Sequence, residues 1–322
     1  MRTPTSIAAS MVALVLALPV FAQQGGTTSV LWRDRGHVAA LNLLDGPGGE
    51  ARAPGTNFKF IEESKTGTAP KFDVEDENGV KWKVKLGPEV RSETAATRLV
   101  WAAGYFTDDD YYRPQIRVQG MTRLSRGNQY VSAGGLVRGV RLERQGGGKK
   151  LGDWSWYETR VDGTREFNGL KVMMALINNW DLKEVNNAVY EEGGAGQRYV
   201  VTDLGASFGR TGYPLVRSKG VMMDYVQTSF VKKVTPDRVD FVMHSRPFFL
   251  TIFHFPNYLL RSRMESIPKH IPIADARWLG NLLGQYSSAQ IGDCFRAGGF
   301  SPAEVEGYTR VVMQRIDVLK KL

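Results

Sequence analysis

The sequence of 322 residues predicts an α+β fold with two lobes, the first rich in strands with one long helix and the second mainly helical. Three observations lead to this prediction. Residues 58–86 alternate apolar and polar side chains as strands do, and residues 89–104 repeat apolar side chains at helical spacing. A glycine-rich segment at 145–150 then ends the strand pattern, and helical patterns dominate the rest of the chain.

The first lobe is predicted to span residues 23–145. Within it, three strands are expected at 58–61, 71–74 and 81–86. Asn78-Gly79 lies between the second and third strands and is a strong hairpin signal, because both residues tolerate the positive φ of a tight turn. The third strand alternates large apolar residues with lysines, so we expect one buried and one charged face. The apolar residues are Trp82, Val84 and Leu86, and the lysines are Lys81, Lys83 and Lys85.

A long helix is predicted to follow, over residues 89–104. Ser92 is its candidate N-cap residue, because a serine hydroxyl can accept a hydrogen bond from the first turn. Gly104 is the expected stop, since glycine readily takes the left-handed backbone that ends many helices. Two further strands are expected near 112–118 and 135–144. The apolar face of the helix consists of Ala95, Leu99, Ala102 and Ala103.

The second lobe is predicted over residues 146–322. Its first helix, at 167–178, places apolar side chains on one stripe, and a strand is expected at 199–204. The segment Ser301-Pro302-Ala303-Glu304 is a capping box that opens the last helix, because the serine and glutamate side chains can each satisfy a backbone amide. The helices expected nearer the carboxyl end span 274–286, 288–297 and 302 to about 319.

Residues 1–22 have the pattern of a signal peptide rather than of a folded element. A basic start at Arg2 precedes an apolar run at 7–18, and Val20-Phe21-Ala22 fits a small-x-small cleavage site. The run is short for a bilayer span, so we expect cleavage after Ala22 and export to the periplasm or the extracellular space. An uncleaved anchor is the alternative. No later apolar run reaches membrane-spanning length, so no transmembrane span is expected after cleavage.

Composition restricts the partners and the kind of site. The formal net charge is +9, which favours acidic partners such as phosphates or an anionic surface. No basic-aromatic binding signature stands out, so nucleic acid is not expected as a partner. Cys294 is the only cysteine, which excludes an intramolecular disulfide, and the four histidines form no zinc-binding pattern.

The residues suited to chemistry lie in two short motifs of the second lobe. Asp181 precedes Asn186 by five residues, and Asp203 begins Asp-Leu-Gly at the end of the expected strand. Carboxylate and amide oxygens are ligands that Mg²⁺ prefers, and protein-bound Mg²⁺ often holds nucleotide phosphates. An aspartate in a short loop can also accept the proton of a hydroxyl group. This spacing therefore indicates phosphoryl-transfer chemistry.

Two upstream elements accompany these motifs: a strand that carries Lys85 and a helix that carries Glu93. With them, the chain resembles the protein-kinase-like superfamily, and within it HipA-like and related atypical kinases. The resemblance covers roughly residues 58–205 and rests on short motifs. They are Ser64-Lys65-Thr66-Gly67-Thr68-Ala69-Pro70-Lys71-Phe72, Trp82-Lys83-Val84-Lys85-Leu86, Glu93-Thr94-Ala95-Ala96-Thr97-Arg98-Leu99, and the Asp181 and Asp203 motifs.

The resemblance implies a kinase-like fold and Mg²⁺-dependent phosphoryl transfer from ATP to an unknown hydroxyl acceptor, either a protein or a small molecule. Lys85 would contact the nucleotide phosphates, and Glu93 would hold Lys85 by an ion pair. Asp181 would be the catalytic base. The phosphate-lining loop would consist of Thr66, Gly67 and Thr68, and the metal ligands would be Asn186 and Asp203.

Simpler interpretations of these residues remain open. Lys85 could be one of three solvated lysines on an exposed strand face, and Glu93 could only complement the helix dipole. No G-x-G-x-x-G loop is present, since segment 65–70 has a single glycine, and Asn179-Trp180 replaces the His-Arg that usually precedes the catalytic aspartate. A catalytically inactive, pseudokinase-like binding module with the same fold is therefore the alternative.

A rival enzyme motif overlaps the same segment. Residues 205–209 match the G-x-S-x-G elbow of serine hydrolases, with Ser207 as the nucleophile and Asp275 downstream. Such an elbow needs a helix directly after the serine, and residues 210–214 do not have a helical pattern. The hydrolase is thus the less favoured alternative. Its candidate histidines are His244, His254 and His270.

Overall fold

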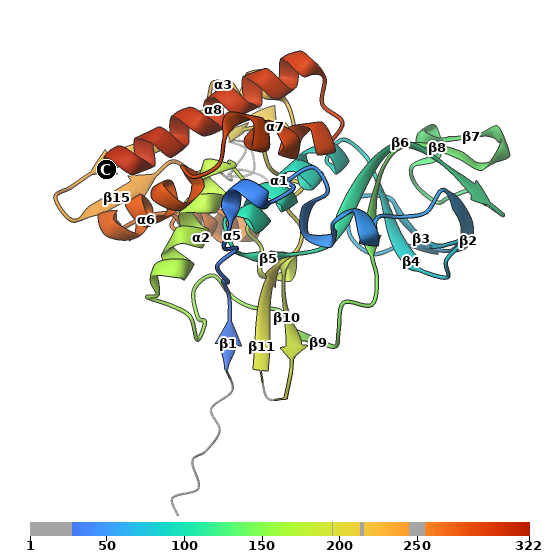
Figure 1. Cartoon of the computed structure of the whole chain (residues 1–322), viewed down its shortest axis with the longest axis horizontal. Helices are drawn as coiled ribbons and strands as arrows, with labels where there is room; N and C mark the ends of the chain where they lie inside the picture. The colour runs from blue at the N-terminus through green and yellow to red at the C-terminus, as the bar shows by residue number, and fades with distance from the viewer. Residues whose placement is uncertain (1–27, 195, 213–215, 245–254) are drawn as a thin grey trace, which may run out of the picture.

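The computed structural model describes residues 28–194, 196–212, 216–244 and 255–322. The predicted signal peptide, residues 1–22, lies outside the described residues. Within the described ranges, no helix combines the length and the apolar character needed to cross a membrane. Figure 1 shows a strand-rich part at one end of the molecule and a helix-rich part at the other, so the predicted α+β fold class is confirmed.

The strand-rich part is a six-stranded sheet with the order β4-β3-β2-β6-β8-β7. Strand β8 also pairs with β4, so the strands from β4 round to β8 close into a circuit. Every strand predicted from the sequence in this region is present. The strands are β2 (Asn57–Ser64), β3 (Lys71–Asp76), β4 (Lys81–Leu86), β6 (Asp110–Gln119), β7 (Val131–Ser132) and β8 (Leu136–Arg144).

The β3–β4 hairpin shows why the sequence specifies this sheet. Gly79 has a φ of 74°, and Asp76 Oδ1 accepts hydrogen bonds from the backbone amides of Asn78 at 2.9 Å and Val80 at 3.0 Å. Trp82 Nε1 donates to the other Asp76 oxygen at 2.9 Å, which satisfies the indole of a fully buried side chain. The alternation in β4 then directs its lysines to the opposite face.

Helix α1 (Val90–Ala102) is the predicted long helix, and it is buried along nearly its whole length. Ser92 is not its N-cap, contrary to the prediction. The hydroxyl of Ser92 donates to the backbone oxygens of Glu89 at 3.0 Å and Gly205 at 2.9 Å, and a hydroxyl used as a donor inside the first turn does not cap it. Gly104 follows the helix with a φ of 94°, as expected for a stop signal.

A second sheet has the order β1-β11-β10-β9, and β5 also pairs with β11. Strands β1 and β5 come from the predicted first lobe, yet both lie parallel to β11 in this sheet. The domain boundary placed between residues 145 and 146 stays a prediction. The strands are β1 (Ser29–Val30), β5 (Phe106–Thr107), β9 (Lys150–Gly152), β10 (Asn187–Glu192) and β11 (Gly196–Val201).

The helix-rich part contains the four helices predicted for the second lobe, which are α2, α6, α7 and α8. The predicted capping box is present, since Glu304 donates its amide to Ser301 Oγ at 3.4 Å and accepts from the amide of Ser301 at 2.8 Å. The described helices are α2 (Arg165–Leu176), α3 (Met222–Val226), α5 (Phe255–Met264), α6 (Ile273–Leu283), α7 (Ser288–Ala297) and α8 (Pro302–Lys321).

The pattern of residues 238–243 predicts a strand, which is present as β15, whereas the other short elements were not predicted. Two small antiparallel sheets consist of β12 (Thr211–Gly212) with β13 (Val216–Arg217), and of β14 (Val231–Val234), β15 (Arg238–Phe241) and β16 (Ile271–Pro272). Single 3₁₀ turns occupy Val38–Ala40, Gly46–Gly48, Glu50–Arg52, Asn128–Tyr130, Ala133–Gly135 and Glu184–Asn186.

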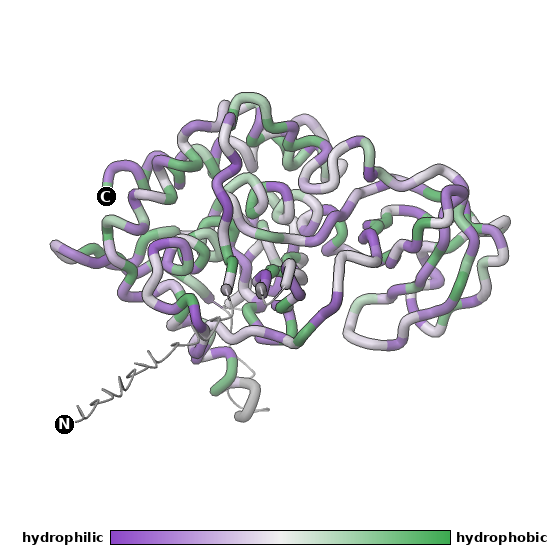
Figure 2. The backbone as a smooth tube through the Cα atoms, turned by 60° about the horizontal axis from the view of Figure 1, so that its bottom comes forward, coloured by the Kyte–Doolittle hydropathy of each residue, from purple (hydrophilic) through white to green (hydrophobic). Residues whose placement is uncertain are grey.

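Helix α1 contributes to one of two hydrophobic cores, and an ion pair fastens it to the sheet that holds the other. One core fills the six-stranded sheet, and the other includes the apolar residues of α1 and of the helix-rich part. Figure 2 accordingly shows hydrophobic segments in both parts of the molecule. A buried ion pair of 2.9 Å between Arg98 and Asp110 fastens α1 to β6. The first turn of α1 also contacts the end of β4, through Glu93 and Lys85, and the segment after β11, through Ser92 and Gly205.

Candidate functional site

Lys85 is the centre of the candidate site. It is 2% exposed, and its Nζ lies 2.7 Å from Glu89 Oε1, 2.8 Å from Glu93 Oε2 and 3.2 Å from Asp203 Oδ1. Glu89 directly precedes α1 and Glu93 lies in its first turn, so both carboxylates face back toward β4. The interpretation of Lys85 as a solvated lysine is therefore wrong, and the predicted ion pair with Glu93 is present.

Arg141 is a residue of the candidate site that sequence reasoning missed. It lies directly opposite Lys85 in the β4–β8 pairing, and it donates to Glu93 Oε1 at 2.8 Å and to the carboxylate of Glu143. Glu93 is thus held on both oxygens by two buried cations. No local pattern marks Arg141, because β8 reaches β4 only through long-range pairing.

Glu89 was also missed, although the sequence holds a usable signal for it. It lies four residues before Glu93 at the start of the predicted helix, and four residues apart is the spacing of side chains on one helical face. Its second oxygen forms an ion pair with Lys219, from the segment that follows Asp-Leu-Gly. Glu89 therefore connects Lys85 to a part of the chain far away in sequence.

The cluster fixes the charges of Lys85 and Asp203. Burial would lower the pKa of Lys85, but Glu93, Asp203 and Glu89 more than offset that effect and raise the pKa above its ordinary value. Burial opposes ionisation of Asp203, but the Lys85 ammonium and its hydrogen bond lower the pKa of Asp203 to about 2. At neutral pH the site accordingly presents an ammonium beside a carboxylate.

Asp181 and Asn186 lie in one closed loop. Asn186 Nδ2 donates to the backbone oxygen of Asp181 at 2.7 Å, and the backbone oxygen of Asn186 accepts from Thr202 N at 3.1 Å. The carboxylate of Asp181 lies 3.0 Å from Lys183 Nζ and 3.7 Å from a guanidinium nitrogen of Arg261. The hydrogen bond from Thr202 places Asn186 next to the residue that precedes Asp203.

The predicted phosphate-lining loop connects β2 and β3. Arg126 donates to the backbone oxygens of Gly67 at 2.9 Å and Thr68 at 3.1 Å, which fastens the loop from outside. Gly67 has a φ of 70°, a left-handed conformation that favours glycine. Thr66 and Gly67 line the same cavity as Lys85, which we call the Lys85 cavity. Thr68 instead lines a neighbouring cavity of about 480 Å³, together with Glu89.

A cavity of about 520 Å³ brings most of the predicted site together. Five of the six residues predicted to bind the nucleotide or the metal line this cavity, and Glu93 lines it as well. Thr68 and Asp181 are not among the residues that line it. The predicted residues that line the cavity are Thr66, Gly67, Lys85, Glu93, Asn186 and Asp203.

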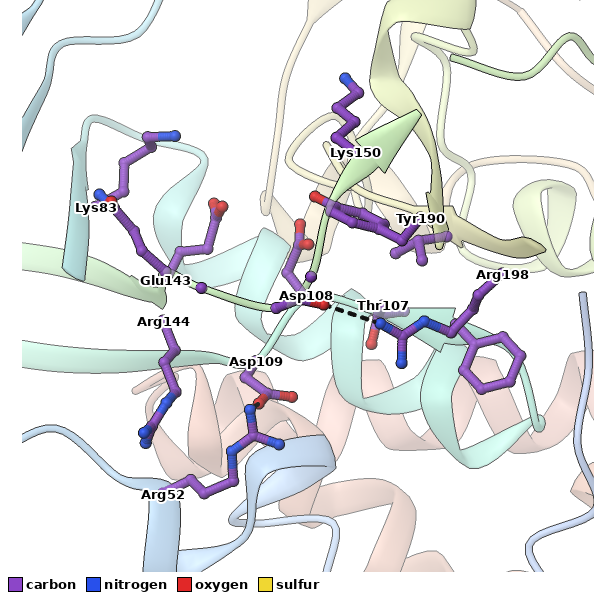
Figure 3. A pocket seen from close by; sticks show the side chains of 16 residues that line it. Arg52, Lys83, Thr107, Asp108, Asp109, Glu143, Arg144, Lys150, Tyr190 and Arg198 are labelled. Atoms are coloured by element: carbon purple, nitrogen blue, oxygen red, sulfur yellow. Dashed lines mark hydrogen bonds and ion pairs between the residues drawn. The ribbon is translucent and has the colours of Figure 1, made fainter. Parts of the chain in front are cut away.

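A second cavity of about 580 Å³ adjoins the first, because five residues line both. Figure 3 shows its charged walls, with arginines and lysines placed around Asp108, Asp109 and Glu143. Arg52 and Asp109 form an ion pair of 2.6 Å across it. The shared residues are Lys83, Asp108, Glu143, Lys150 and Tyr190.

No protein-family model and no curated protein matches this sequence. Among solved structures, the chain is similar to the Helicobacter pylori proinflammatory kinase CtkA, with a TM-score of 0.48, 13% identity, and coverage of 83% of this chain and 98% of that chain. It is also similar to the Golgi casein kinase with Mn/ADP bound, with a TM-score of 0.37, 10% identity, and coverage of 83% and 73%.

A third similar structure is the Rio2 kinase-ADP/Mg²⁺-phosphoaspartate complex from Chaetomium thermophilum, with a TM-score of 0.32, 11% identity, and coverage of 80% of this chain and 72% of that chain. All three similar structures are kinases. Because identities and TM-scores are low, we base the function on the residues of this chain.

The rival hydrolase site is not supported by the geometry. Ser207 is 0% exposed, and its hydroxyl has no hydrogen-bond partner among the described residues. The segment after it forms the short strand β12 instead of the helix that a nucleophile elbow requires. His254, one of its candidate histidines, lies outside the described residues. A serine without access to solvent cannot attack a substrate in this conformation.

Proposed function

We propose that this protein is an atypical kinase that transfers a phosphoryl group from ATP, with Mg²⁺, to a hydroxyl acceptor. The observation that carries the proposal is the buried Lys85 ammonium, held by Glu93 and in contact with Asp203, at the wall of a cavity that Asn186 also lines. Phosphoryl transfer depends mainly on positioned charge, and this arrangement supplies both signs of charge at one place.

Asp203 and Asn186 would hold the magnesium ion. Oxygens of Glu89, Glu93 and Asp203 lie within 4.8 Å of one another, but the Lys85 ammonium already contacts all three carboxylates. A metal ion would therefore use the cavity side of Asp203, whose side chain remains 41% exposed. Asn186 fits beside it, because its amide nitrogen is used by Asp181 and its amide oxygen is the atom suited to a hard cation. Bound there, Mg²⁺ would neutralise charge on the donor phosphates.

Asp181 would accept the proton of the acceptor hydroxyl. Its carboxylate is only partly exposed, and the ion pairs with Lys183 and Arg261 would keep it oriented. The acceptor would approach from the side of these two cations, since Asp181 does not line the Lys85 cavity. Membership of the HipA-like group and export of the protein are parts of the same proposal.

The test is transfer from ATP labelled on its γ-phosphate, measured as self-phosphorylation, as labelling of added casein and as release of phosphate. Asp181→Ala and Asp203→Ala should each lower turnover by about a hundredfold or more, with unchanged circular dichroism. Asp317→Ala, on the exposed face of α8, is the matched control and should behave as the wild type. Turnover that survives both site changes would rule out this mechanism.

A non-catalytic nucleotide-binding module is the second candidate. It is favoured by one observation: the carboxylate of Asp181 lies outside the cavity lining and is already paired with Lys183 at 3.0 Å. A wild type that binds MgATP but transfers no label, in any of the three assays, would support this candidate instead of the kinase.

A further inference from the structure

Three arginines from separate elements line the second cavity. Arg52 ends a 3₁₀ turn, Arg144 ends β8 and Arg198 lies in β11. Figure 3 shows their side chains on different sides of Asp109. None of these four residues lines the Lys85 cavity, so they form a separate group of charges beside the proposed nucleotide site.

Asp109 is the carboxylate that these arginines share. Its Oδ2 lies 2.6 Å from a guanidinium nitrogen of Arg52. Burial raises the pKa of Asp109, and the charges of Arg52, Arg144 and Arg198 each oppose that rise, so all three act on the same carboxylate. A single negative charge cannot neutralise three positive ones, so most of the positive charge must be balanced elsewhere.

The other two acidic residues that line the cavity do not supply this balance. Glu143 is already paired with Arg141. Burial and the nearby charge of Glu143 hold the pKa of Asp108 well above its ordinary value, which disfavours the charged form of Asp108. The cavity wall therefore keeps an excess of positive charge on the side of the three arginines.

Arg144 is the least satisfied of the three. In the part of the chain that the structure describes, its guanidinium has no hydrogen bond and no ion pair, and it lies 6.0 Å from the ring centroid of Trp82. Its backbone amide donates to the backbone oxygen of Asp109 at 2.9 Å, which places the residue at the cavity wall. A guanidinium offers five N–H donors in a planar fork, so Arg144 is suited to bind an oxyanion.

Arg198 is held at the wall of the same cavity by two contacts. Its guanidinium donates to the backbone oxygen of Gly147 at 3.1 Å, which fixes its direction. It also lies 3.4 Å from the carboxylate of Glu192, but Glu192 forms a second ion pair of 3.3 Å with Arg33 and is therefore shared. The position of Arg198 is thus fixed, while its charge is only partly compensated.

Concave cavities with positioned guanidinium groups commonly bind small anions. A phosphate group and a dicarboxylate share the chemistry required here, since both present several oxygens and up to two negative charges. We propose that the second cavity binds a small molecule with such a dianionic group, held by Arg144 and Arg198. Because five residues line both cavities, this molecule would lie next to the proposed nucleotide site, but it would bind without nucleotide or magnesium.

A purely structural role of the arginines predicts a different result. If they only fastened Asp109 to β8 and β11, removal of any of them would lower the stability, and no anion would bind with saturation. The Arg144 side chain, however, has no hydrogen bond or ion pair to lose within the described residues. Arg144→Ala should therefore melt close to the wild type without ligand, and lose only the stabilisation that a bound anion gives.

The experiment compares the wild type with Arg144→Ala, Arg198→Ala, Arg138→Ala and Lys71→Ala. Arg138 is the matched control, because it is an exposed arginine of the same strand as Arg144 and does not line the second cavity. Lys71 lines the Lys85 cavity and not the second cavity, so it reports on binding there. Calorimetric titrations with inorganic phosphate and with malonate, without nucleotide or magnesium, measure affinity. Thermal unfolding with and without each anion measures stability.

We expect at least one of the two anions to bind the wild type with saturation. Arg144→Ala and Arg198→Ala should bind it about tenfold to a hundredfold more weakly, as the loss of a hydrogen bond to a charged group implies. Arg138→Ala and Lys71→Ala should match the wild type. Tighter binding of phosphate would identify a phosphorylated ligand and tighter binding of malonate a dicarboxylate, and either result supports the site.

Four results would overturn the inference. A wild type that binds neither anion with saturation would show that the cavity is not an anion site. Equal affinity of the wild type and both arginine variants would place the anion elsewhere. Affinity that is lost in Lys71→Ala but kept in Arg144→Ala would place the anion in the Lys85 cavity, which removes the second site and leaves the proposed function intact. An Arg144→Ala variant that melts well below the wild type without ligand would show a structural role instead.

Discussion

At the scale of single residues, the site depends on one buried ammonium and the carboxylates around it. Lys85 contacts three carboxylates, and Arg141 holds the far oxygen of Glu93. Taking such charges out of water is costly, and a buried ion pair is often no more stabilising than well-packed apolar side chains. A fold that keeps this cluster beside a cavity is therefore better explained by binding than by stability.

Asp203 should give the protein a measurable dependence on acid. Its folded pKa of about 2 lies below its ordinary value of 3.8, so the ionised form stabilises the folded state. That stabilisation is complete above about pH 4 and is lost as the pH falls toward 2. The stability difference between the wild type and Asp203→Asn should therefore shrink over this range.

Urea unfolding of both proteins between pH 5 and 2 measures this change, with Asp317→Asn reporting the effect of removing a surface carboxylate. Because the Asp203 side chain is 41% exposed, solvent screening should limit the change to about 1 kcal/mol or less. A difference that stays constant with pH would show that Lys85 does not hold the Asp203 charge in solution.

At the scale of elements, local patterns predicted what local forces determine. The β3–β4 hairpin, helix α1 and the capping box of α8 were predicted because turn residues, apolar spacing and caps act over a few residues. Ser92 was assigned wrongly, because its hydroxyl donates to a carbonyl of the distant Asp-Leu-Gly segment. Arg141 went unnoticed for a similar reason, since its partner strand is far away in sequence.

Ser92 should position α1 against the Asp-Leu-Gly segment. Its hydroxyl bridges the backbone oxygens of Glu89 and Gly205 at 3.0 and 2.9 Å. Ser92→Ala should cost about 1 kcal/mol of stability and also weaken MgATP binding several-fold, because Glu89 and Glu93 lie in the same turn. Thermal unfolding and calorimetry measure the two effects.

Ser301→Ala is the matched control for this change. Loss of a helix cap also costs about 1 kcal/mol, but Ser301 lies at the start of α8 and lines no part of the Lys85 cavity. Its MgATP affinity should equal that of the wild type. If both variants lose affinity equally, the effect of Ser92 is one of general stability and not of position.

At the scale of the whole molecule, the two-part α+β organisation followed from the sequence, while the way its sheets are assembled did not. Strands β1 and β5 lie in the second sheet although they come from the predicted first lobe, and β14, β15 and β16 were not expected as a sheet. Such pairings join segments whose local patterns are short and similar, so no local signal selects the partner. Most of the residues predicted to bind nucleotide and metal nevertheless line one cavity, because the predicted elements that carry them are present.

Calorimetric titration of MgATP into the wild type, Asp203→Ala and Asp317→Ala tests the central claim most directly. We predict magnesium-dependent binding to the wild type and to Asp317→Ala, and its loss in Asp203→Ala. Binding that is absent from the wild type, or that is equally strong in Asp203→Ala and independent of magnesium, would contradict the claim that Lys85, Asn186 and Asp203 form a site for a metal-bound nucleotide.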